Sequence, residues 1–391
     1  MNPEIMLSAH VEQTIIRASQ CRGEYVIAAQ DTTYFNYTGH KQMEGLGIIQ
    51  GNTRGLMQHN IMLMSQTGQP LGIMGQKYWT REGAIDLRPS EKESQKWQKA
   101  LALINQKASQ FQQKVVLVED READIFSFFK AQRQANVELL VRVYQPRRVE
   151  LVTTEVVKPL NEISELLTDY GIRKISILRD NKQVELTLRV KAAKVNVYPG
   201  KNLSAKKHKT QGLSLVVAEE ISCVDCQTGE ALDLAIKPSK WNLLTSLPID
   251  NLADVEMIVE FYALRWRIER FHYTLKSGAL NVERLQFDDI HTLVNALSFY
   301  SVVAWQLMSL TYALRENPNQ AANEIFTTEE LDILQRLEKI KISTVAQGVL
   351  ALGKIVGFTP SRKQPFPGIK VLAQAIDRFF FIKMGATTKA F

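Results

Sequence analysis

The sequence predicts a mixed α/β protein whose core is interrupted by a β-rich excursion. Up to residue 145, apolar β-branched runs alternate with helical patterns. Residues 146–246 are instead dominated by alternating β-type runs, and the patterns after residue 248 are helical to the end. Strands that alternate with helices before such a change of texture are typical of an α/β core that carries an insertion.

Composition sets the broad class of the protein. A chain of 391 residues can form roughly two or three domains, each with its own core. With 45% hydrophobic and 23% charged residues, the chain falls in the soluble globular class. A net charge of +7 favours an acidic partner, and nucleic acid is the commonest one.

Cysteine usage argues against a disulfide framework and fits a reducing compartment, such as the cytoplasm. The three Cys include a CVDC pair, Cys223 and Cys226. A structural zinc site needs four ligands, and only His208 is available nearby, so we do not expect zinc.

Four segments begin the predicted core. Residues 3–20 predict a helix, and EYVIAAQ (24–30) predicts a buried strand that leads into Asp31. Residues 60–79 predict two strands around a turn that contains glycine. Residues 90–111 predict a helix.

The predicted core continues with a strand, a helix and a strand. The 90–111 helix before them has Ser90 as its expected N-cap. KVVLVED (114–120) is the clearest buried strand and ends on Asp120. Residues 121–132 then predict a helix, and residues 136–145 predict another strand.

One apolar stretch, residues 292–314, has no charge and is long enough to cross a membrane. Six Asn, Ser, Gln and Thr residues interrupt it, which favours a buried core helix. The N-terminus lacks a basic start and an unbroken apolar run, so no signal peptide and no membrane association are expected.

Residues 260–278 read as one helix with a polar face. On a regular helix, Tyr262, Arg265, Glu269 and Lys276 fall within an arc of roughly 60°. Such a face is either simply solvated or part of a site. The apolar stripe beside it, which a half-buried helix requires, consists of Leu264, Ile268, Phe271 and Leu275.

Three carboxylates are the candidates for chemistry. Asp31 and Asp120 each end a buried strand, although each could instead form a turn or cap a helix. Together with Glu269 they could form an oxygen-rich cluster that suits Mg²⁺ or Mn²⁺. Two such ions can assist phosphoryl transfer, and Arg265 and Lys276 beside them would suit a phosphate backbone.

The spacing of Tyr262, Arg265, Glu269 and Lys276 matches the pattern Y-x2-R-x3-E-x6-K. On this basis the chain resembles the bacterial DDE transposases of the insertion-sequence-four family. The resemblance spans nearly the whole chain. It also rests on QDTT (30–33), EKES-x-KW (91–97), DREADI (120–125), KWNLLTS (240–246), RWRIE-x-FH (265–272) and GF (357–358).

This resemblance implies a ribonuclease-H-like core interrupted by a β-rich insertion. It implies that Asp31, Asp120 and Glu269 are the catalytic triad and bind two Mg²⁺ or Mn²⁺ ions, with no small-molecule cofactor. Such enzymes nick DNA at the transposon end, form and reopen a hairpin, and join the 3′-OH to target DNA. The expected partners are therefore DNA and a second copy of the chain in a synaptic dimer.

The resemblance also implies DNA contacts. Trp241 would stack on a flipped base, since an extruded base needs an aromatic face, but core packing is the alternative for this ring. Arg121 and Glu122 would support the site, with pairing on a helix surface as the alternative, and Arg121 also counts among the expected DNA contacts. A basic loop in the insertion is either a DNA contact or solvated. The full set of expected DNA-contacting residues is Tyr262, Arg265, Lys276, Trp241, Arg121, His272, Lys206, Lys207 and Lys209.

Relatives in this family usually carry a helical N-terminal domain, and only a short segment precedes Asp31 here. We therefore weigh a metal-dependent transposase against a shortened regulator that dimerises with full-length transposase, and against a nuclease without joining activity. The expected segments are an N-terminal remnant (1–20), a ribonuclease-H-like core segment (21–145), the insertion (146–250), a further core segment (251–316) and a helical dimerisation region (317–391).

Overall fold

The protein, seen here as a computed structural model, folds as two compact units. The structure describes residues 3–81, 92–179, 182–199, 209–232, 238–362 and 364–387. The first unit comprises Met1–Arg17, Thr32–Asp86 and Glu269–Phe391. The second unit comprises Ala18–Asp31 and Leu87–Ile268. Strand β1 (Tyr25–Asn36) and helix α5 (Trp266–Tyr273) each pass from one unit into the other.

The second unit is built on three parallel strands. The first half of β1 pairs with β5 (Lys114–Glu119), and β5 pairs with β6 (Val137–Arg142). Their apolar runs are buried almost throughout, as parallel strands with both faces covered require. Helix α4 (Leu252–Leu264) packs on β1, and the Phe261 ring meets the Tyr25 ring edge-on at 5.5 Å.

The β-rich insertion extends this sheet. Strand β12 (Lys240–Thr245) pairs antiparallel with β6 and also with β11, so the insertion continues the core hydrogen-bond ladder. Two short helices, α2 (Gln95–Lys107) and α3 (Phe126–Phe129), belong to the same unit. The other insertion strands are β7 (Arg148–Leu151), β8 (Val157–Pro159), β9 (Thr168–Arg179), β10 (Lys182–Val197) and β11 (Leu213–Asp225).

The first unit contains the predicted hairpin, β3 (Thr53–Ser65) and β4 (Pro70–Trp79), with Gly68 at a φ of 95° in its turn. Strand β2 (Gly47–Gln50) pairs with β3. The predicted N-terminal helix is α1 (Pro3–Gln20). The second half of β1 lies beside β3, so close that Gly55 admits no side chain there.

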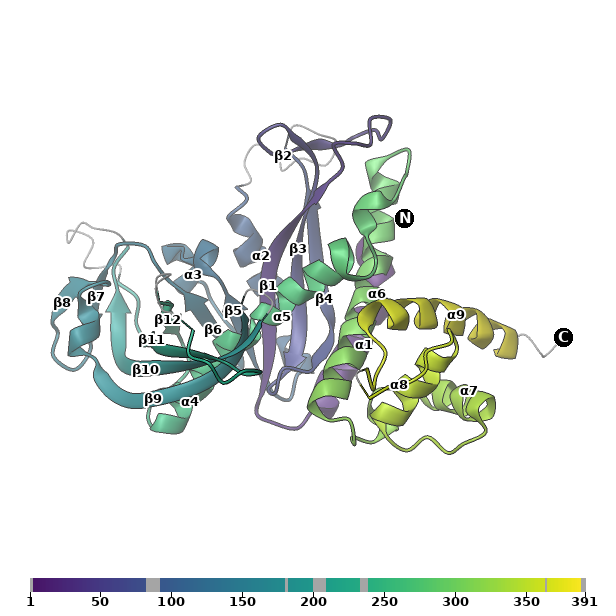
Figure 1. Ribbon diagram of the computed structural model, residues 1–391. Helices are drawn as coiled ribbons and strands as arrows, with labels where there is room; N and C mark the ends of the chain where they lie inside the picture. The colour runs from purple at the N-terminus through teal and green to yellow at the C-terminus, as the bar shows by residue number, and fades with distance from the viewer. Residues whose placement is uncertain are drawn as a thin grey trace. The chain divides into compact units, whose positions relative to one another are not determined.

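The C-terminal region of the first unit is helical, in green to yellow in Figure 1. Helix α6 (Ile290–Glu316) packs with α7 (Thr328–Glu338), α8 (Val345–Lys354) and α9 (Ile369–Thr387) around a shared apolar core. Among the described residues, α6 alone is long and apolar enough to span a membrane, yet more than half of its apolar stretch is buried inside the protein. It is the core helix that the polar interruptions indicated.

Mixed α/β architecture is confirmed, but several local predictions are wrong. Helix α2 begins at Gln95 after Ser94, and Ser90 lies outside the described residues. Asp31 lies within β1 rather than after it. The predicted helix over 121–132 is a 3₁₀ turn (Arg121–Ala123) followed by the single turn of α3. The two units cut across the five expected segments, whose functional division stays a prediction.

The 260–278 segment is not one regular helix. Helix α4 ends at Leu264, α5 follows after Arg265, and Thr274–Gly278 forms a π-helical turn. An added Cβ on Gly278 would lie 2.8 Å from the Tyr273 ring, so glycine permits this close turn. The four signature residues therefore do not share one continuous helical face, and π-turns of this kind are frequent at functional sites.

Candidate active site

The parallel strands of the second unit end in a row of polar side chains. The β1–β5 register pairs Ala29 with Val118, and the same offset places Asp31 opposite Asp120. One residue earlier, Gln30 Nε2 donates a 2.6 Å hydrogen bond to Glu119 Oε1, which confirms that the offset continues. Neighbours across parallel strands project to the same face, so the two aspartates lie side by side.

The surroundings of Asp120 disfavour its charged form on balance. Burial raises its pKa, and the nearby Asp31 carboxylate raises it further. The Glu122 backbone N–H, which donates to Asp120 Oδ1 at 2.8 Å, and the Arg265 guanidinium lower it. A bound cation would relieve the repulsion between the two aspartates.

Residues of the DREAD stretch hold Asp120 in place. Glu122 forms a 2.9 Å ion pair with the largely buried Lys96 of α2. Asp124 is buried, forms an ion pair with Arg147 and accepts the backbone N–H groups of residues 144 and 145. The Asp124 carboxylate thus anchors the loop that follows β6. These contacts hold residues 120–125 in a turn instead of the regular helix that the sequence predicted.

Arg142 is a site residue that the sequence reasoning missed. The β5–β6 register pairs Glu119 with Val141, and the next residues along are Asp120 and Arg142. Arg142 therefore continues the row of strand ends, and its guanidinium lies close enough to Tyr262 of α4 to lower the pKa of that hydroxyl. The signal was present, since Arg142 ends an apolar strand just as Asp120 does.

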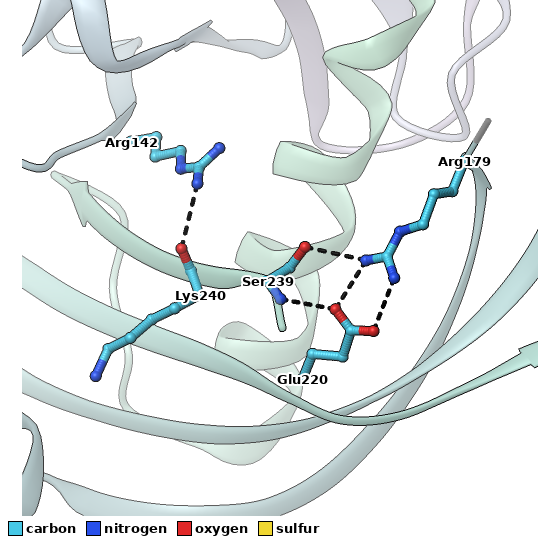
Figure 2. A network of polar contacts seen from close by, with 5 residues as sticks. All are labelled: Arg142, Arg179, Glu220, Ser239 and Lys240. Atoms are coloured by element: carbon cyan, nitrogen blue, oxygen red, sulfur yellow. Dashed lines mark hydrogen bonds and ion pairs between the residues drawn. The ribbon is translucent and has the colours of Figure 1, made fainter. Parts of the chain in front are cut away.

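Figure 2 shows what fixes Arg142 from the insertion side. Its guanidinium donates to the Lys240 carbonyl at 3.3 Å, while the Lys240 side chain points away. The segment before β12 is held by Glu220, whose carboxylate accepts the Ser239 N–H at 2.7 Å and two bonds of 2.8 and 2.7 Å from Arg179. Bidentate arginine–carboxylate pairs of this kind are geometrically rigid.

Three predicted DNA contacts, Tyr262, Arg265 and Trp241, belong to the second unit. Burial raises the pKa of Tyr262, while the Arg265 and Arg142 guanidinium groups lower it, so both arginines lie near the Tyr262 hydroxyl. The Trp241 ring packs edge-on against Tyr262 at 5.0 Å, and both rings are buried. The packing alternative for Trp241 thus describes its place in this structure, and its base-stacking role stays a prediction.

Glu269 and Lys276 belong to the first unit. Glu269 lies in the first turn of α5, and Lys276 lies in the π-turn. Lys276 Nζ donates to the Tyr34 carbonyl at 2.7 Å and lies 3.7 Å from Glu283. Lys276 is thus partly engaged within the protein, and its contact with a DNA phosphate stays a prediction.

The remaining predicted DNA contacts differ in their surroundings. Arg121 is exposed, with its guanidinium 5.9 Å from the Tyr144 ring. Lys209 is paired with Glu150 at 2.5 Å, whereas Lys206 and Lys207 lie outside the described residues. His272 is buried and lies against Asn60, and its contact with DNA stays a prediction.

The donors of the second unit fit a hard divalent cation. Asp31 and Asp120 offer only oxygen, and their mutual repulsion favours a bound positive ion. Within the described ranges of the chain, no three His, Cys, Asp or Glu side chains gather in a ready-made metal site. Cys223 is buried and Cys226 exposed.

Comparison with known proteins agrees with this reading. A family model described as a transposase DDE domain matches residues 84–305. The match includes Asp120 and Glu269 and begins after Asp31. A solved piggyBac transposase synaptic complex with hairpin DNA is similar at a TM-score of 0.40 and 9% identity, and the similarity covers 98% of this chain.

The chain spans 58% of the length of that solved transposase, and a similarity this low does not establish a shared fold. The family match does establish the family, because it extends over more than half of the chain. The protein therefore belongs to the family of transposases that share the DDE domain.

Proposed function

We propose that this chain is a divalent-metal-dependent DNA transposase of the insertion-sequence-four group. It would cut DNA at transposon ends, pass through a hairpin and join the freed 3′-OH to target DNA. One observation carries the proposal: Asp31 and Asp120 lie side by side at the end of a parallel sheet, with two arginines beside them.

The carboxylates and the arginines have complementary tasks. Asp31, Asp120 and, by the family signature, Glu269 would hold Mg²⁺ or Mn²⁺. When bound, such ions activate an attacking oxygen and stabilise the leaving oxygen in phosphoryl transfer. Arg142 and Arg265 place positive charge next to the carboxylates, where a phosphate of the DNA backbone would bind.

A homodimer is part of this proposal. Helix α9 carries exposed apolar side chains, among them Phe380, Phe381 and Met384. Exposed aromatic and Met side chains on one helix are typical of protein–protein contacts. They support the expectation that the C-terminal region contributes to a synaptic dimer.

The proposal is tested on a duplex that carries the inverted repeat flanking the gene. Cleavage is followed with Mn²⁺ on denaturing gels, which separate nicked strands, hairpins and joined products. We expect all three products from the unaltered chain and none from Glu269→Gln. Glu260→Gln is a matched control, because Glu260 is exposed on the neighbouring helix α4.

Each other outcome contradicts a specific claim of the proposal. Unchanged cleavage by Glu269→Gln would exclude the assigned triad. Nicking without hairpin or joined product would indicate a nuclease. A chain that binds the duplex without cutting it, and that inhibits a full-length relative, would be the regulator instead.

A further inference from the structure

A buried network of amide, hydroxyl and imidazole groups lies against α5 in the first unit. At its centre is Asn60 on β3, which is fully buried. Asn60 Nδ2 lies 3.0 Å from His272 Nε2, and Asn60 Oδ1 accepts from Gln76 Nε2 at 2.7 Å. The contact joins α5 to a strand that is far away in the sequence.

The other members of the network form hydrogen bonds with one another. Gln58 Nε2 and Gln76 Nε2 both donate to Ser301 Oγ, at 3.2 and 2.8 Å. Tyr78 accepts from Gln58 at 2.8 Å and donates to Gln76 at 2.9 Å. These groups come from β3, β4 and α6. A polar network this well satisfied in a buried site fixes its members in one arrangement.

The network also fixes the state of His272. Asn60 Oδ1 already accepts from Gln76, so the Asn60 amide must present its N–H to His272. His272 Nε2 therefore accepts, and the imidazole carries its proton on Nδ1. A side chain that binds through one defined nitrogen has one defined orientation.

This orientation matters because of what α5 carries. His272 follows Glu269 by three positions, which puts both on one side of the helix. Helix α5 is short and lies between the break at Arg265 and the π-turn, so a longer regular helix does not set its rotation. The fully buried Ile268 and Phe271 side chains anchor α5, and the contact between His272 and Asn60 adds a directional polar constraint.

The neighbouring residue of β3 makes a matching contact on the other side of the strand. His59 Nδ1 lies 2.9 Å from Thr32 Oγ1, and Thr32 directly follows Asp31. Successive strand residues point to opposite faces, so His59 and Asn60 serve different partners. Strand β3 thus contacts both segments that carry a proposed metal ligand.

We propose that His272 and Asn60 are positioning residues that fix the rotation of α5 and so hold the Glu269 carboxylate ready for the metal. The inference rests on the proposed function, which supplies the role of Glu269. It is an alternative to the expected role of His272 as a DNA contact. Asn60 also bonds Gln76 and Gln58, so replacing it removes one partner from each of these buried amides and lowers stability as well.

The test replaces both partners by apolar side chains, in Asn60→Leu combined with His272→Leu. We expect Mn²⁺-dependent cleavage to fall about 10- to 100-fold in kcat, the usual effect of losing a group that orients a metal ligand. The KM for DNA should stay unchanged, whereas the Tm should fall modestly, because Gln76 and Gln58 each lose a hydrogen bond to Asn60. Mn²⁺ binding should weaken, and hydrogen exchange should accelerate in α5 but not in α7–α9.

Two further variants separate positioning from structure. His272→Gln should restore most activity, because its Oε1 can accept from Asn60. Gln69→Leu is the matched control, since Gln69 joins the β3–β4 turn to Ser309 of α6 by an amide–hydroxyl contact of 3.0 Å outside the network. It should cleave normally.

Two results would overturn the inference. One is normal cleavage and normal Mn²⁺ binding by the double variant. The other is a loss of activity accompanied by a uniform rise in hydrogen exchange across the chain, or failure of all network variants to fold. If the unaltered chain and the double variant both fail to cut, the proposed function fails, while the exchange and Mn²⁺ measurements still decide the role of His272.

Discussion

Asp120 and Glu269 are held in place by different kinds of structure. Asp120 ends a short apolar strand, and the parallel register with β1 places Asp31 beside it. Glu269 lies on a short helix between two irregular turns, and that helix contacts the sheet of its own unit through the amide of Asn60. The first position depends on backbone pairing, and the second depends on side chains.

The two carboxylates should therefore be displaced by different kinds of substitution. A strand end tolerates changes in most neighbouring side chains, since the ladder of backbone hydrogen bonds sets its position. A short helix has little rigidity of its own, so one buried contact can decide its rotation.

The largest effect is expected from the paired aspartates, Asp31 within β1 and Asp120 after β5. Asp31→Asn and Asp120→Asn should each lower Mn²⁺-dependent cleavage more than about 100-fold, because each removes several kcal/mol of charge stabilisation. The double variant should be little worse than either single one, since the pair acts as a unit. Single-turnover rates measure this, with Asp169→Asn in the insertion as control.

A second contrast concerns how the two units lose local stability as the pH falls. In the first unit, burial and the Arg17 charge lower the pKa of His10 to about 4. Its Nε2 accepts the Ile73 N–H at 2.9 Å, which requires the neutral ring. The stability from this contact is full above about pH 6.5 and is lost as the pH falls towards 4, since the unfolded chain binds the proton first. The loss is on the order of 3 kcal/mol.

Hydrogen exchange in α1 at about pH 7, 5 and 4 checks this. His10→Gln should remove the pH dependence, because its amide oxygen accepts without titrating.

In the second unit, burial raises the pKa of Glu150, but hydrogen bonds from Lys209, Tyr198 and Asn196 together lower it to about 2. Strand β7 should therefore stay protected at about pH 4. Equal loosening of β7 and α1 would contradict the contrast.

The smallest effect is expected at Arg142. Arg142→Ala should weaken DNA binding about tenfold and lower the slope of log K against log salt by about 1, as the loss of one phosphate contact does. Binding titrations at several salt concentrations measure both. The control is Arg189→Ala, because Arg189 is exposed and paired with Asp169 at 2.6 Å. An unchanged salt slope would remove Arg142 from the DNA site.

The strands were largely predictable, because buried parallel strands leave unbroken apolar runs such as residues 114–119. Asp31 and Asp120 were predictable for the same reason. The helix expected at 121–132 was not formed, because the Asp124 carboxylate binds Arg147 and the backbone after β6. No local pattern reveals a contact between residues so far apart in the chain.

The same limit applies around α5. His272 looked like one more basic residue on a charged face, because its partner Asn60 lies in a distant strand. The break at Arg265 and the π-turn were hidden in a pattern that fits a regular helix. Arg142 was missed although its strand-end position resembled that of Asp120.

Equilibrium binding of Mn²⁺ to the DNA-free chain tests most directly whether the paired aspartates form a metal site. Free Mn²⁺ can be followed by electron paramagnetic resonance, for the unaltered chain, for Asp120→Asn and for the control Asp169→Asn. We predict that Asp120→Asn weakens binding at least about tenfold, since a ligand matters no less than the groups that orient it. Equal binding by all three proteins would contradict the assignment of this edge of the sheet as the metal site.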